Sequence, residues 1–327
     1  MARRLGRRTA WLASAVLAGA GVAAAWNISP AASDGGAALG DAPTYGPARL
    51  SAPPNAGAVQ ARIWAPGLDA GYNPQGLAVA EGSLLVSAYR SDSLRRNRGP
   101  CRVFRLDPAT GTETGRFDLP PPCGHAGGVA YAAGTIFVAD TRTLFIVPFR
   151  LAFQGPQGTP PVRIVPLGPG LTGSLMASDP DGVWIGSYRE DGPGGMARFP
   201  VPALLGLADG QALTRGMAAA EMPIPSHAQG AAPDPDGRRM WVSRSDLGWG
   251  RLEELDVRSG ALLRTSPAPG GLEGIAFDGA GRLWGVSESG ARHTYDVPGA
   301  RLLWPFHPVV FGLDPVRLVP QRPARDQ

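Results

Sequence analysis

Three oxygen-bearing side chains of this sequence stand directly before glycines that open short runs of small residues: Gln75, Gln229 and Glu273. Carboxylate and amide oxygens are the ligands that a hard cation such as calcium prefers. A carboxylate in a narrow, water-poor place is costly unless it binds a cation or hydrogen-bond donors. The pattern therefore indicates a calcium-like divalent cation at Glu273, with the two glutamines helping. The alternative is that Glu273 forms a salt bridge with an arginine.

Arginine recurs after the apolar run in three similar segments, at Arg90, Arg142 and Arg189, and two of these follow Tyr89 and Tyr188. Converging guanidinium groups could hold a carboxylate, phosphate or sulfate by forked hydrogen bonds. These five residues are therefore candidates for binding a small anionic molecule. The alternative is that the arginines form surface ion pairs, which stabilise little. The carboxylates in reach along the chain are Asp92, Asp140, Glu190 and Asp191.

Two histidines and two cysteines complete the candidates. His125 and His227 precede runs of small residues and could act as general bases, although loop histidines are more often structural. Cys101 and Cys123 lie in loops expected on the same face, so we predict one disulfide; the alternative is two free buried thiols. The closed loop would stabilise the fold by about 3 kcal/mol on the loop-entropy model.

Other chemistry is excluded by residue type. All 31 basic side chains are arginine, so Schiff-base chemistry on lysine and a phosphate-binding P-loop lysine are ruled out. The sequence contains no Gly-x-Ser-x-Gly elbow and no His-Glu-x-x-His. The residues named above are therefore the candidates for chemistry.

The elements that position these residues form a repeat. Each copy has a glycine, a hairpin turn and a short apolar run; the copies are 74–90, 125–142, 171–189, 228–246 and 272–289. The anchoring glycines are Gly76, Gly128, Gly173, Gly230 and Gly274. Each repeat has room for four short strands, which is one propeller blade. The sequence therefore predicts an all-β protein with a single β-propeller of five detectable blades, and it leaves a sixth open.

Two further features support a closed ring. The second strands align Leu85, Phe137, Trp184, Trp241 and Trp284, which we expect to form the packing layer between blades. Residues 60–68 resemble an outer strand without inner strands of their own, so we predict that they pair with the final blade and remove an exposed sheet edge. Residues 202–220 are expected to form a short surface helix within blade three.

The N-terminus indicates export. Residues 1–25 combine arginines, an apolar stretch and a small-residue cleavage pattern, which is typical of a signal peptide; an uncleaved signal anchor is the alternative. Residues 26–58 are rich in alanine, glycine and proline and predict a flexible linker, followed by a propeller domain over 59–327. Without the leader's four arginines, 27 basic residues face 27 acidic ones. We therefore expect a secreted monomer that binds no nucleic acid and no membrane surface.

The segments "PQGLAVAEGSLLVSAY" and "LEGIAFDGAGRLWGVSES" resemble the gluconolactonase and regucalcin-like family and its strictosidine-synthase-like relatives. This resemblance implies a propeller that binds a divalent ion near the channel axis and hydrolyses lactones or similar esters. Glu273, before Gly274, matches the family's metal-binding glutamate, although that residue lies in the family's first blade. The family also takes asparagine from middle blades, whereas the last asparagine here is Asn97.

Two functions follow as hypotheses. In the first, the protein is a metal-assisted lactone or ester hydrolase, with Glu273, Gln229 and Gln75 on the ion, His125 or His227 moving protons, and the arginines orienting an acidic substrate. In the second, it is a binding or scaffold propeller without catalysis.

Overall fold

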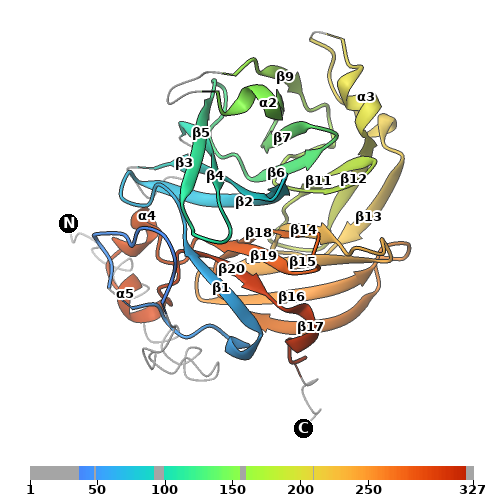
Figure 1. The fold of residues 1–327 in the computed structure, drawn as a ribbon. Coiled ribbons are helices and arrows are strands. Elements are labelled where there is room, and N and C mark those ends of the chain that lie inside the picture. The colour runs from blue at the N-terminus through green and yellow to red at the C-terminus, as the bar shows by residue number, and fades with distance from the viewer. Residues whose placement is uncertain (1–36, 48, 92–98, 155–159, 209, 322–327) are drawn as a thin grey trace, which may run out of the picture.

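The chain forms five four-stranded antiparallel sheets arranged around a central channel (Figure 1). The computed structural model describes residues 37–47, 49–91, 99–154, 160–208 and 210–321, so the expected signal peptide lies outside the described residues. The prediction of a five-bladed β-propeller is confirmed. The innermost strands contact one another in the order β2, β6, β10, β14, β18 and back to β2.

The blades have these bounds. Blade one has β2 (Tyr72–Ala80), β3 (Ser83–Arg90), β4 (Cys101–Leu106) and β5 (Glu113–Leu119). Blade two has β6 (Gly128–Ala132), β7 (Thr135–Asp140), β8 (Thr143–Pro148) and β9 (Arg163–Pro166). Blade three has β10 (Leu175–Asp179), β11 (Gly182–Ser187), β12 (Gly194–Pro200) and β13 (Ala220–Ile224). Blade four has β14 (Ala228–Pro233), β15 (Arg239–Asp246), β16 (Trp249–Asp256) and β17 (Leu262–Ala268). Blade five has β18 (Leu272–Phe277), β19 (Leu283–Ser287), β20 (Val309–Leu313) and β1 (Val59–Trp64).

The helices are short. They are α2 (Phe149–Ala152), α3 (Val201–Leu205), α4 (Arg292–Tyr295) and α5 (Ala300–Leu303), with 3₁₀ turns η1 (Ala56–Ala58), η2 (Arg215–Met217) and η3 (Pro315–Arg317). α3 falls at the insertion where the sequence predicts a surface helix. Within the described part of the chain, no helix is long and apolar enough to cross a membrane.

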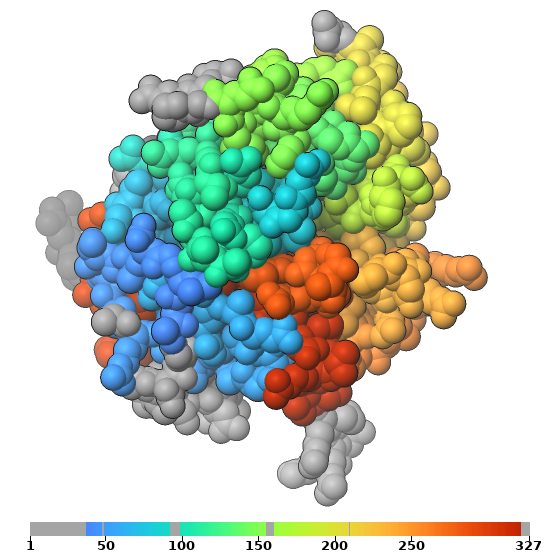
Figure 2. All heavy atoms as spheres, viewed as in Figure 1, coloured from blue at the N-terminus to red at the C-terminus, as the bar shows by residue number. Residues whose placement is uncertain are grey.

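The ring closes through the first strand of the chain. β1 pairs antiparallel with β20, with Trp64 opposite Val309 and Ile63 opposite Val310. The sequence prediction for residues 60–68 is therefore confirmed for β1. Figure 2 shows the result at the surface, where blue N-terminal residues adjoin the red C-terminal strand.

Glycine lets the inner strands approach one another. A Cβ on Gly128 would lie 2.5 Å from the Met176 backbone nitrogen, and one on Gly230 would lie 2.5 Å from the Glu273 carbonyl oxygen. A Cβ on Gly274 would collide with the Leu77 backbone nitrogen. These glycines are therefore required by backbone contact between neighbouring blades.

Blade three departs from the predicted glycine alignment. Leu175 pairs with Gly186 on β11, as Gly76 pairs with Ser87 in blade one, so the structural equivalent of the anchoring glycines is Leu175 and not Gly173. A Cβ on Gly186 would meet the Leu175 side chain. In blade three the small residue, Gly186, is therefore on the second strand, and the Leu175 side chain of the inner strand packs against it.

The expected aromatic layer is confirmed. The five second-strand residues, Leu85, Phe137, Trp184, Trp241 and Trp284, are all buried. Each packs with apolar residues of the next blade as well as its own. Each also pairs with an inner-strand alanine: Ala78, Ala130, Ala177, Ala232 and Ala276. A large residue opposite a small one lets wedge-shaped blades pack around the axis.

Part of the predicted linker contacts blade five. Leu39 bridges Ile63 of β1, and Leu50 is buried. The Tyr45 hydroxyl donates to the Gly290 carbonyl at 2.9 Å, and the Ser51 hydroxyl accepts from the Phe306 amide. The residues described before β1 are therefore attached to the propeller by specific bonds.

Gly274→Ala should destabilise the ring, because its Cβ would meet backbone that cannot move independently. We expect the free energy of unfolding to fall by at least about 2 kcal/mol, measured by urea denaturation. Gly279→Ala is the matched control, since its Cβ would meet nothing within 4 Å. Equal stability of the two variants would contradict this explanation.

His307 should make stability depend on pH. Its ring is 1% exposed, and burial lowers its pKa to about 4 against a smaller opposing effect of the Ser51 backbone. The unfolded histidine has a pKa of about 6.5, so the unfolded chain binds the extra proton first and stability falls as pH drops from 6.5 to 4. The loss at pH 5 relative to pH 7 should be about 2 kcal/mol. His307→Leu should remove that part of the pH dependence in denaturation curves; an identical loss in the variant would refute the assignment.

Candidate functional site

The three predicted cation ligands occupy β-bulges. The pairing of inner and second strands shifts register at Gln75, at Gln229 and at Glu273–Gly274, in blades one, four and five. A bulge leaves its extra residue outside the regular ladder and redirects its side chain. β14, β18 and β2 are neighbouring inner strands. The structure therefore brings the three residues to one end of the channel, at the N-terminal ends of the inner strands, which we call the channel mouth.

A buried hydrogen-bonded cluster lies at this mouth, across the contact between blades five and one. The Asn73 amide nitrogen donates to Glu288 Oε2 at 2.7 Å and to the Tyr89 hydroxyl at 3.2 Å. The Gln75 amide nitrogen donates to the same Glu288 oxygen at 3.0 Å and to the Pro74 carbonyl at 2.8 Å. We call Asn73, Gln75, Tyr89 and Glu288 the Glu288 cluster.

The cluster is almost closed to water. Asn73 is 0% exposed, Tyr89 1%, Gln75 4% and Glu288 9%. Asn73 Oδ1 is buried and accepts no hydrogen bond within the described residues. The sequence analysis assigned no role to Asn73 or Glu288. A signal for Asn73 was available, because it lies two residues before Gln75 on the strand that forms β2.

Glu273 is a second buried carboxylate beside this cluster. It is 3% exposed, and its carbonyl accepts from the Ser243 hydroxyl at 2.6 Å, which ties blade four to blade five. Gln229 is half-buried. Within the residues that the structure describes, no group of three or more histidine, cysteine, aspartate or glutamate side chains could hold a metal ion. A cation here would thus depend on amide oxygens as well as Glu273.

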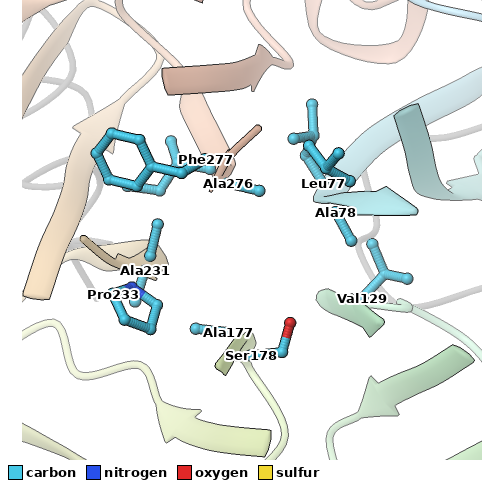
Figure 3. A pocket seen from close by; sticks show the side chains of 12 residues that line it. Leu77, Ala78, Val129, Ala177, Ser178, Ala231, Pro233, Ala276 and Phe277 are labelled. Carbon is cyan, nitrogen blue, oxygen red and sulfur yellow. The ribbon is translucent and has the colours of Figure 1, made fainter. Parts of the chain in front are cut away.

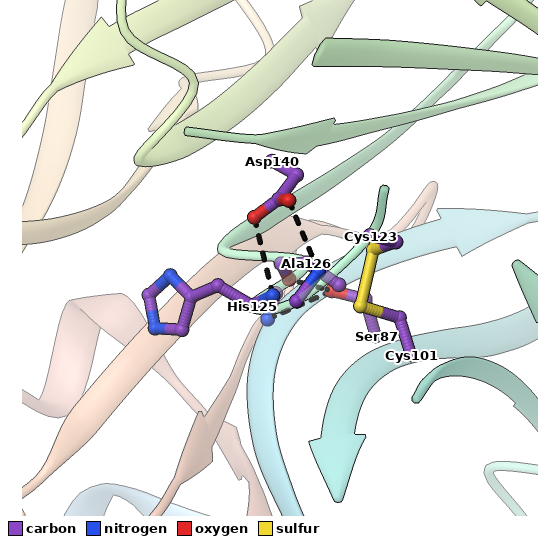
Figure 4. The surroundings of a disulfide bond; sticks show 8 residues. Ser87, Cys101, Cys123, His125, Ala126 and Asp140 are labelled. Carbon is purple, nitrogen blue, oxygen red and sulfur yellow. Dashed lines mark hydrogen bonds between the residues drawn. A yellow bond between two sulfur atoms is a disulfide. The ribbon is translucent and has the colours of Figure 1, made fainter. Parts of the chain in front are cut away.

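His125 lies in a loop that is fixed from three sides (Figure 4). The predicted disulfide between Cys101 and Cys123 is present, with Cα atoms 5.8 Å apart, and joins this loop to β4. Asp140 accepts from the backbone amides of Gly124 and His125, both at 3.1 Å. The Ser87 hydroxyl donates to the Ala126 carbonyl at 2.9 Å. These bonds hold the His125 ring 5.1 Å from that of Tyr89.

His227 lies in a second aromatic group at the mouth. The Tyr188 hydroxyl is 3.3 Å from His227 Nδ1, and the His227 and Trp249 ring centroids are 5.8 Å apart. His227 has a backbone φ of 57°, which is uncommon for a residue other than glycine. The two candidate histidines thus belong to separate groups, one between blades one and two and the other between blades three and four.

The three arginines lie at second-strand ends or in the turns that follow, and all are exposed. Arg142 and Arg189 form no ion pair within the described part of the chain. Asp140, one of the expected partners, instead binds backbone amides, and Asp92 lies outside the described residues. The arginines are thus peripheral to the Glu288 cluster.

The opposite end of the channel is lined by backbone and by mainly small or apolar side chains. A cavity of about 80 Å³ there is surrounded by side chains from all five inner strands, including Leu77, Val129, Ala177, Pro233 and Phe277 (Figure 3). None of the candidate site residues lines it. The polar chemistry of the channel is therefore at the mouth.

Comparison with known proteins supports the fold and nothing finer. No protein-family model and no curated sequence matches the chain. Among solved structures, glutaminyl cyclase from Myxococcus xanthus matches with a TM-score of 0.52 and 11% identity, over 81% of this chain and 97% of that one. The gluconolactonase XC5397 from Xanthomonas campestris matches with a TM-score of 0.39 and 18% identity, over 70% and 75%. A luciferin-regenerating enzyme matches with a TM-score of 0.41 and 12% identity, over 74% and 92%. The resemblance to such propellers is one of fold.

Asp140→Ala should loosen the His125 loop, because it removes the acceptor of two backbone amides. A hydrogen bond to a charged group is worth about 1.5–3 kcal/mol, so exchange of the Gly124 and His125 amides should accelerate about tenfold or more. Hydrogen exchange followed by mass spectrometry measures this. Asp191→Ala, which removes an exposed carboxylate, is the control and should leave the loop's protection unchanged; unchanged protection in Asp140→Ala would count against the proposed role.

Proposed function

We propose that this protein is an exported β-propeller that binds a small molecule at the channel mouth. The observation that carries the proposal is the Glu288 cluster, where polar groups are buried and Asn73 Oδ1 has no donor among the described residues. A buried acceptor without a donor costs about 1–3 kcal/mol. A ligand that supplies the donor would recover this free energy. Export is supported by the leader sequence and by the disulfide.

The first chemical form of this proposal is metal-assisted hydrolysis of a lactone or ester. Glu273, Gln229 and Gln75 would hold a calcium-like divalent cation through side-chain oxygens, and these donors fit because the Gln75 amide nitrogen is already engaged. When bound, the ion would polarise the substrate carbonyl and activate water. His125 or His227 would move protons, while Arg90, Arg142 and Arg189 would orient an acidic part of the substrate at the rim.

The second form is binding without catalysis. It is favoured by the absence, within the described residues, of three histidine, cysteine, aspartate or glutamate side chains around one point. It is also favoured by the packing of His227 between Tyr188 and Trp249. In this form Tyr89 and Tyr188 provide contact surface for the ligand, and the histidines fix the positions of these rings.

Metal binding separates the two forms. Calcium titrated into metal-stripped protein should release or absorb heat in a calorimeter, and Glu273→Gln should weaken binding at least tenfold because it removes the charged ligand. Glu190→Gln neutralises an exposed carboxylate and should have no effect. No bound metal by elemental analysis, together with no calorimetric signal, would remove the hydrolytic form.

A further inference from the structure

The Glu288 cluster contains acceptor oxygens that receive no hydrogen bond from the described residues. Asn73 directs its amide nitrogen to Glu288 Oε2 and to Tyr89, which leaves Oδ1 as a buried acceptor without a partner within the described residues. Glu288 Oε1 likewise accepts no hydrogen bond in this part of the chain, and Glu288 retains 9% exposure. The two oxygens belong to side chains that are bonded to each other. A ligand reaching them must bring N–H or O–H groups.

The charge at the same place is negative. Glu288 is bonded to two neutral amides, and no ion pair to it is found among the described residues. A carboxylate in a low-dielectric place is strongly stabilised by a cation. The missing donor is therefore expected to carry positive charge.

The bonding pattern distinguishes an organic cation from a metal ion at this point. The amide N–H groups of Asn73 and Gln75 both occupy Glu288 Oε2, which leaves two acceptors, Glu288 Oε1 and Asn73 Oδ1, whereas a calcium ion takes about six to eight oxygen ligands. An ammonium group has three N–H donors of its own, which suit Asn73 Oδ1 and Glu288 Oε1. Aromatic rings also stabilise ammonium groups through their faces. Tyr89 with His125, and Tyr188 with His227 and Trp249, supply such rings at the mouth.

We infer that the Glu288 cluster binds the ammonium group of a small amine or amino-acid-like molecule. This inference deepens the proposed function and rests on it, since it names the chemical class of the ligand. Glu288 supplies the charge, Asn73 Oδ1 the second acceptor, and Gln75 orients the carboxylate. The exposed Arg142 and Arg189 could contact an acidic group elsewhere on the same molecule.

The test uses a pair of probes that differ mainly in charge. Alaninamide carries an ammonium group, and N-acetylalaninamide has the same backbone with that group neutralised. Binding to the full chain is measured by ligand-observed NMR titration at constant ionic strength. Alaninamide should bind at least about tenfold more tightly than its acetylated partner, because only the charged probe makes charge-assisted bonds. Glu288→Gln and Asn73→Leu should each remove most of this preference, and Glu190→Gln should retain it.

The outcomes separate the inference from the proposed function. Equal binding of the two probes by the wild-type protein would overturn the ammonium assignment and leave small-molecule binding standing. Binding of neither probe, with no calcium signal, would overturn both. The wild-type comparison needs no variant, so a misfolded Glu288→Gln protein would not spoil the test. A variant that keeps its circular dichroism spectrum and its full preference for alaninamide would also overturn the assignment.

Discussion

The close approach of five inner strands around one axis is the constraint on which the molecule depends. At Gly76, Gly128, Gly230 and Gly274 the backbone of one blade touches that of the next, and no side chain fits between them. The inner-strand alanines, one in each blade, then leave room for the large second-strand residues that pack between the blades. Because the ring is closed, each such contact has neighbours on both sides, and a change in one is transmitted to the next.

This constraint also decides where polar side chains can lie. The crowded middle of the channel admits backbone and small residues, and its far end is lined mainly by apolar ones. Polar residues appear where bulges interrupt strand pairing, at Gln75, Gln229 and Glu273. The bulges therefore place these side-chain oxygens at one end of the channel. Residues about 200 positions apart become neighbours there, and local sequence gives no hint of which ones will touch.

Features that depend on local sequence could be predicted, whereas contacts between distant residues could not. The blades, the closing strand and the disulfide could be predicted because each follows from a local repeat or a simple loop argument. The glycine alignment was wrong in blade three, where Gly173 was predicted as the anchoring residue, because the small residue of that blade is Gly186 on the second strand. The Glu288 cluster could not be predicted: Asn73 and Glu288 are 215 residues apart, and their bond depends on side-chain directions set by the whole ring. Likewise, the composition of residues 37–58 suggests a linker but does not report its bonds to blade five.

The position of the site within the ring has its own consequence. Glu288 comes from blade five, whose outer strand is β1, while its amide partners Asn73 and Gln75 come from blade one. The hydrogen bonds of the Glu288 cluster therefore cross the contact between the last blade and the first. Pairing of β1 with β20 holds blade five together, and the side-chain bonds then connect it to blade one. A chain whose ring failed to close would separate Glu288 from Asn73 and Gln75, so the site is complete only in the closed ring.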